Sequence, residues 1–205
     1  MNRTCVKVFL GIMLTAGLFA HNGCGGKELA MHHNELAAYY ALMNLVEAEQ
    51  NLHLEDSDRN GKRDYWVEDV SGLYRLTNAL GKQIALINKD VAMADSDPVP
   101  PSDKPPVGPE LTDNPVPFNG YYYAIITYDA HGKEYAQDSN GDNLTYENPY
   151  SFAFCAFPAE YGVTGNKTFV INEKGTVYWK DIGGEAADSF PSSLEDDEWS
   201  SERPE

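Results

Sequence analysis

Hydrophobic and polar positions follow two different periods along this chain. Between Asn34 and Leu54, apolar residues recur three and four positions apart, which predicts an amphipathic helix with Asn34 as its N-cap. Residues 150–181 instead combine short apolar or alternating runs with turn residues. The apolar run 152–157 predicts a buried strand, and the runs on either side of Gly175 predict a β-hairpin.

These elements together predict an α+β fold. A further strand is expected over residues 121–128, and short helical stretches are expected over 73–80 and 83–93. An antiparallel sheet with a buried face needs a cover, and a helix is the usual one. We therefore expect the N-terminal amphipathic helix to pack on a small antiparallel β-sheet within one domain, residues 34–184.

Two segments depart from the composition of a folded core. Residues 97–117 hold eight of the twelve prolines, which predicts a Pro-rich insertion that crosses the surface. Residues 185–205 carry eight acidic residues and one basic residue, Arg203, together with Ser and Pro. This composition predicts a disordered acidic tail.

The first 23 residues have the features of a signal peptide. A basic start precedes an apolar stretch over residues 8–20, which is too short for a membrane span. Cys24 then stands where a lipoprotein carries its acylated cysteine, and residues 24–33 would form a tether. The alternative is cleavage near Ala20. We expect an exported protein, either lipid-anchored in the cell envelope or secreted or periplasmic.

The pairing of the cysteines depends on whether Cys24 is acylated. Cys5 leaves with the signal peptide, so Cys24 and Cys155 remain. If Cys24 is acylated, Cys155 stays unpaired and is expected to be a small buried residue. If it is not acylated, a disulfide between the two is open to the chain in an oxidising compartment.

The charge balance excludes some partners. The chain has 15 basic and 32 acidic residues and a formal net charge of −17. Nucleic acids require clustered Lys and Arg, and anionic lipid surfaces repel an acidic chain. The composition suits an extracellular surface that attracts cations, and any contact with membrane would pass through an acylated Cys24.

An Asp-rich loop follows the predicted helix. Ca²⁺ takes six to eight oxygen ligands, which alternate positions of a tight loop can supply. Asp56, Asp58 and Asn60 match loop positions one, three and five, the backbone carbonyl of Lys62 matches position seven and Asp64 position nine. The acidic residue of position twelve is missing, because Val67 stands there. The interpretation is a Ca²⁺ loop, and the alternative is a solvated turn rich in Asx residues.

A second loop has a similar but weaker pattern. Asp138, Asn140 and Asp142 alternate in the same way, but the sixth position is not glycine. This loop is a second candidate for a metal, and it could share one ion with the first loop only if the fold brings the two together.

Two stretches carry a resemblance to a known family. The stretch FCAFPAEYGVTGNKTFVINEKGTVYWKD resembles the C-terminal part of prepilin-like and pseudopilin-like envelope proteins, as found in type II secretion systems and type IV pili. The earlier stretch NELAAYYALMNLVEAEQNLHLEDSDRNGKRDYW resembles their helix and the loop after it. The resemblance implies a head domain with a structural or assembly role and with partners in the envelope or the secretion machinery. This chain lacks the long apolar stalk that builds filaments, which implies a free or anchored head.

The motifs that would indicate an enzyme are not found. There is no Gly-x-Ser-x-Gly elbow, phosphate loop or His-Glu-x-x-His. We therefore expect a non-enzymatic protein stabilised by Ca²⁺. The first alternative is an extracellular module that binds a glycan or polymer through residues 121–123, Trp66 and Tyr161. The second alternative is a hydrolase.

Overall fold

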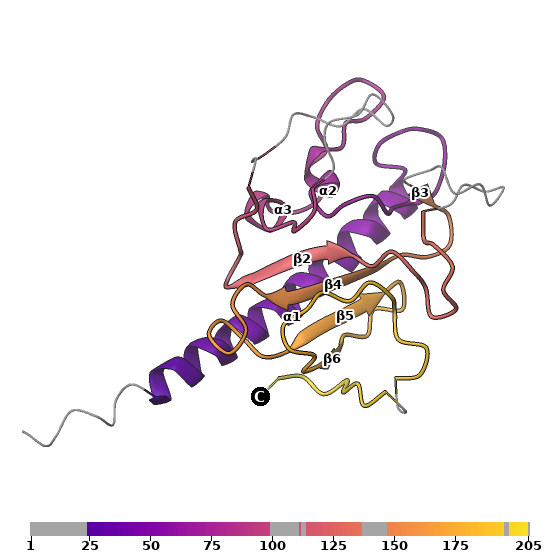
Figure 1. Ribbon diagram of the computed structural model, residues 1–205. Coiled ribbons are helices and arrows are strands. Elements are labelled where there is room, and N and C mark those ends of the chain that lie inside the picture. Colours follow the sequence, from indigo (N-terminus) through magenta and orange to yellow (C-terminus); the bar gives the residue numbers. More distant parts are fainter. Residues whose placement is uncertain (1–23, 99–110, 112–113, 137–146, 195–196, 205) are drawn as a thin grey trace, which may run out of the picture.

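The computed structural model describes residues 24–98, 111, 114–136, 147–194 and 197–204. Its longest element is helix α1 (Cys24–Glu55), and its first turns extend beyond the rest of the domain (Figure 1). The helix starts ten residues before the predicted N-cap, so residues 24–33, which the sequence assigned to a tether, are helical. The reason is that residues 27–33 contain no proline and no strong helix breaker. Asn34 lies within the helix, and its side chain donates to the carbonyl of Thr164 (2.9 Å).

A four-stranded antiparallel sheet forms the second layer. It consists of β2 (Tyr121–Ile125), β4 (Ala153–Pro158), β5 (Thr168–Asn172) and β6 (Tyr178–Lys180), in the order β2-β4-β5-β6. The predicted hairpin is confirmed as β5 and β6, with Phe169 opposite Trp179. The predicted α+β fold class is confirmed as well, although β2 is shorter than expected.

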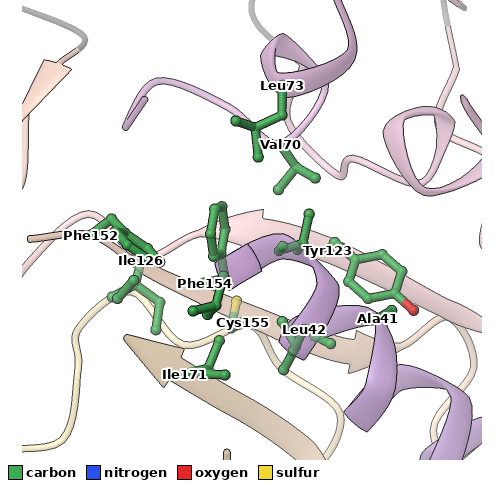
Figure 2. Packing of buried hydrophobic residues seen from close by; sticks show 14 of the residues in the cluster. Ala41, Leu42, Val70, Leu73, Tyr123, Ile126, Phe152, Phe154, Cys155 and Ile171 are labelled. Carbon is green, nitrogen blue, oxygen red and sulfur yellow. The ribbon is translucent and has the colours of Figure 1, made fainter. Parts of the chain in front are cut away.

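The core lies between α1 and this sheet. The helix contacts β2, β4 and β5, and every residue of β5 is buried. Figure 2 shows Leu42 of α1 among sheet residues that include Phe154 and Ile171, with Val70 and Leu73 approaching from the segment above β2. Aromatic and aliphatic side chains from distant parts of the sequence therefore share one core.

Two very short strands form a separate ladder that the sequence did not predict. β1 (Tyr65–Trp66) pairs antiparallel with β3 (Glu147–Asn148), and Trp66 stands opposite Glu147. Trp66 is buried, and its backbone N–H donates to the carboxylate of Glu49 in α1 (3.0 Å). This ladder places residue 147 beside the loop that follows α1.

The expected helices between residues 73 and 93 are shorter than predicted. They are α2 (Gly72–Arg75) and α3 (Lys89–Met93). Thr77 and Gln83 form an isolated antiparallel bridge, which interrupts the helical pattern that the sequence shows there. Most of the Pro-rich segment 97–117 lies outside the described residues.

The C-terminal segment differs from the predicted disordered tail in the parts that the structure describes. Phe190 is buried, and its N–H donates to the carbonyl of Tyr128 (2.8 Å). Ser200 forms a bridge with Trp179 of β6. The physical reason is that two apolar residues of the segment, Phe190 and Trp199, pack against the core. A prediction from the acidic composition does not take these contacts into account.

The two remaining cysteines lie on different elements. Cys24 is the first residue of α1, and Cys155 is a free thiol buried in β4. Burial raises the pKa of the Cys155 thiol to about 12, so this thiol is protonated and inert at neutral pH. The expected signal peptide, residues 1–23, lies outside the described residues. Among the helices that the structure describes, none combines the length and apolar character needed to cross a bilayer.

Candidate functional site

The Asp-rich loop begins where α1 ends and is shaped by side chains that bond its own backbone. Asp56 Oδ1 accepts from the N–H of Gly61 (3.3 Å), Asp58 Oδ1 from that of Asn60 (3.4 Å), and Asn60 Oδ1 from that of Lys62 (2.7 Å). Gly61 has a φ of 83°, a left-handed conformation that glycine adopts without strain. The loop therefore turns tightly and keeps its oxygen-bearing side chains together.

Glu147 joins this loop from β3. Its carboxylate accepts from Asn60 Nδ2 (3.2 Å) and lies 3.7 Å from Lys62 Nζ. Because Trp66 pairs with Glu147, the strand that ends the loop also fixes the position of this carboxylate. Sequence reasoning found that position twelve of the loop lacks an acid, but it could not find Glu147, which lies 80 residues beyond Val67.

Two carboxyl groups of this site, Asp58 and Glu147, have raised pKa values. Desolvation by burial, and to a smaller extent the nearby Asp56 and Asp64, raise the pKa of Asp58 to about 6. Burial likewise raises the pKa of Glu147 to about 7, with Asp64 as the next cause and Lys62 opposing it. Asp58 and Asp64 are only 8% and 6% exposed. The site thus gathers four carboxyl groups, Asp56 included, and one exposed lysine, so protons or a cation must offset their repulsion.

The loop as described is not a closed coordination shell. Of the residues that the structure describes, no three His, Cys, Asp or Glu side chains stand in an arrangement that would hold a metal ion. The oxygens of Asp56 and Asp58 instead accept from backbone N–H groups, and Glu147 accepts from the Asn60 amide, so all three side chains would have to turn toward an ion. The second predicted loop, Asp138, Asn140 and Asp142, lies outside the described residues.

A buried carboxyl lies close to the loop on α1. Glu49 is fully buried, and one of its oxygens accepts from Trp66 while Oε1 has no hydrogen-bond partner. Desolvation raises the pKa of Glu49 well above its usual range, and Asp64 adds to the rise. One turn later, His53 stacks on Tyr65 with 4.4 Å between the ring centroids. Sequence reasoning missed Glu49, because it falls on the buried stripe of the helix where an apolar residue is expected.

A second acidic region lines a cleft of about 360 Å³ between the segment before α2, β2 and residues 186–188. Asp69 lies at this cleft and accepts from Arg75 Nη2 (2.7 Å), Ser71 Oγ (2.6 Å) and the N–H of Gly72 (2.8 Å). Because the hydroxyl of Ser71 donates to Asp69, this serine serves to hold the segment in place. Asp95 accepts from the backbone N–H of Ser71 (2.6 Å) in the same network.

Asp95 is expected to make the stability of the protein depend on pH. Burial, and after it the charge of Asp69, raises the pKa of Asp95 to about 7. The folded chain keeps this proton up to about pH 7, whereas the unfolded chain releases it at about pH 4. The free energy of unfolding should therefore fall as the pH rises through this window. Urea denaturation between pH 4 and 8 measures this slope, and Asp95→Asn should flatten it. An equal slope in the variant would show that another group is responsible.

The predicted aromatic platform for a glycan is not formed. Tyr121 and Tyr123 are fully buried in β2, and Trp66 is buried beside Asp69. Tyr161 is about half exposed and bonds Asp181. The proposed platform residues therefore do not share one surface, because the alternate residues of β2 point into the core under α1.

The class of protein follows from these features. It is an α+β domain in which one long helix packs on an antiparallel sheet and an acidic loop joins the helix to a second, two-stranded ladder. The chain belongs to the family described as "Protein of unknown function (DUF2950)", whose model matches residues 25–199. No curated protein and no solved structure matches the chain significantly.

Proposed function

We propose that this protein is a non-enzymatic, exported domain of the cell envelope, with a structural or assembly role like that of a pseudopilin head. We further propose that Ca²⁺ stabilises it at a site formed by Asp56, Asp58, Asn60, Asp64 and Glu147. The backbone carbonyl of Lys62 would be a further ligand. The observation that carries the metal proposal is the position of Glu147, because this residue supplies the carboxylate that the loop lacks in sequence.

The electrostatics of the loop support a hard dication. Ca²⁺ prefers carboxylate and amide oxygens, and the site offers four carboxyl groups and the Asn60 amide. Burial and, after it, repulsion from neighbouring carboxyl groups raise the pKa of Asp58 and Glu147, and attraction to a bound ion would offset both effects. It would also tie the end of α1 to β3, since the ligands come from both sides of the β1–β3 ladder.

The layout of the domain supports the assembly role. Residues 25–30 of α1 are exposed, and Figure 1 shows the first turns of this helix extending away from the sheet. A helix that extends beyond its domain offers a surface for a partner in the envelope. The resemblance of the helix and of the segment 154–181 to pseudopilin-like proteins points to the same role. A capture experiment tests it: the purified chain should retain proteins of the secretion machinery from an envelope extract, and retention of none would contradict this role.

Calorimetric titration tests the metal proposal. Ca²⁺ titrated into the chelator-treated chain should bind with one-to-one stoichiometry, and Asp58→Asn should weaken binding by at least about tenfold, because it removes a charged ligand. Mg²⁺ should bind more weakly, since it requires a rigid octahedral shell that this loop does not provide. Asp90→Asn, an exposed change in α3, is the matched control. No heat of binding for Ca²⁺, or equal binding by both variants, would overturn the proposal.

A further inference from the structure

The outer strand of the sheet, β6, is covered by the end of the same chain. Trp179 and Ser200 exchange two backbone hydrogen bonds, from Trp179 N–H to the Ser200 carbonyl (2.8 Å) and from Ser200 N–H to the Trp179 carbonyl (3.0 Å). β6 is the last strand in the sheet order, so its other side would otherwise present unpaired backbone groups. Ser200 thus takes the place that one residue of an added strand would occupy.

Side chains of β6 also hold this segment by its backbone. Trp179 Nε1 donates to the carbonyl of Glu202 and Lys180 Nζ to that of Asp197, both at 2.7 Å. All four of these bonds between β6 and the segment therefore involve the backbone of the segment. Such contacts select a strand-like conformation, as in β-strand addition.

The charges of the two partners are complementary. Lys167 lies 4.7 Å from the centre of the Trp179 ring, and Lys180 lies on β6 itself. Residues 195–205 carry six acidic residues and one arginine. Lys167 is also paired with Glu35 (2.6 Å), so Lys180 is the residue of β6 that presents a positive charge to the acidic segment.

The contact is of a kind that a competing strand can replace. Only one residue of the segment pairs with β6 in a ladder, and Asp197, Glu202 and Arg203 remain exposed. Arg203 continues onto α1, where its Nη1 donates to the hydroxyl of Tyr40 (3.1 Å). The segment is thus held by a few polar bonds, by the half-buried side chain of Trp199 and by the buried Pro204.

We propose that the β6 edge is a docking edge for an extended acidic peptide, that residues 197–204 occupy it as an intramolecular ligand, and that the same segment of a second copy of this chain occupies it in trans. Nothing in this inference depends on Ca²⁺ binding. It gives the domain a means of joining to its own copies through a segment that already fits the edge.

A labelled peptide tests the inference on the full chain. In the variant Ser200→Pro, the ring removes the N–H that donates to Trp179, so the segment should leave the edge. A fluorescein-labelled peptide of residues 197–204 should then bind this variant at least about tenfold more tightly than the unaltered chain, whose own segment competes at a high effective concentration. Fluorescence anisotropy measures both affinities. Ser201→Pro, one exposed residue further, is the control and should behave like the unaltered chain.

Two further measurements keep the test decisive. Adding Trp179→Phe to the Ser200→Pro variant should weaken peptide binding about tenfold, because the indole N–H that holds the Glu202 carbonyl is lost. If Ser200→Pro impairs folding, excess unlabelled peptide added to the unaltered chain should still shift the NMR resonance of the chain's own Ser200 backbone N–H, because that group then leaves the Trp179 carbonyl. Equal peptide affinity in the variant and the unaltered chain, or no shift of that resonance in the presence of peptide, would overturn the inference.

Discussion

Replacing Asp69 with alanine is expected to lower the free energy of unfolding by about 3–5 kcal/mol, because it leaves a buried arginine without its carboxylate. Asp69 and Arg75 are almost completely buried and lie 2.7 Å apart. The same carboxylate also accepts from Ser71 Oγ and from the N–H of Gly72. The substitution therefore leaves several buried donors with one acceptor fewer, and each such loss costs about 1–3 kcal/mol.

Chemical denaturation measures this loss. Glu47→Ala, on the exposed side of α1, is the matched control and should change the free energy of unfolding by less than about 0.5 kcal/mol. The double variant Asp69→Ala with Arg75→Met should recover part of the loss, because it removes the buried charge as well. A single variant as stable as the control would show that the pair does not hold the segment before α2 in place.

Gly165→Ala is expected to destabilise the fold by about 3 kcal/mol, through overpacking and the loss of a buried hydrogen bond. A Cβ at this position would lie 2.1 Å from the hydroxyl oxygen of Tyr121 and 2.7 Å from Cζ of its ring. Tyr121 is fully buried and donates to the carbonyl of Lys167 (3.0 Å), so its ring has little freedom to move. The added methyl group must therefore displace Tyr121 from the interface between α1 and the sheet.

Thermal denaturation measures this effect, which should lower the Tm by about 6–12 °C for a domain of this size. Gly26→Ala serves as the control, since a Cβ there meets nothing within 4 Å and alanine favours the helix. The control should leave the Tm unchanged or raise it slightly. If Gly165→Ala has the same Tm as the control, the ring of Tyr121 is not fixed in the position that the structure shows.

Local sequence patterns were sufficient to predict the main layers of this fold. The stripe of apolar residues from Leu36 to Leu52 and the alternation in β5 each have a clear period, and both lie where the core requires them. The ladder of β1 and β3 could not be predicted in this way. Each of its strands has two residues and exists through pairing across about 80 positions of sequence, so no local period marks it.

The residues of the candidate site could likewise be predicted only where the pattern is local in sequence. The alternating Asp and Asn residues that bond their own loop were visible in sequence, because the loop is local. Glu147 and the buried Glu49 were not, because the first is placed by pairing with Trp66 and the second by packing of the helix. The disordered tail was predicted from its acidic, Ser- and Pro-containing composition, and that prediction missed the way Trp179 and Lys180 hold the segment by its backbone.

The most direct test of the central claim is the effect of Ca²⁺ on the melting temperature of Glu147→Gln. At a Ca²⁺ concentration about 100 times the Kd, binding should stabilise the unaltered chain by about 2.7 kcal/mol and raise its Tm by roughly 5–10 °C relative to EDTA. Glu147→Gln should lose most of this increase, because it removes the one carboxylate that the sheet adds to the loop. The exposed control Glu160→Gln should keep it. An unaltered chain whose Tm does not respond to Ca²⁺, or a Glu147→Gln variant that responds in full, would contradict the account.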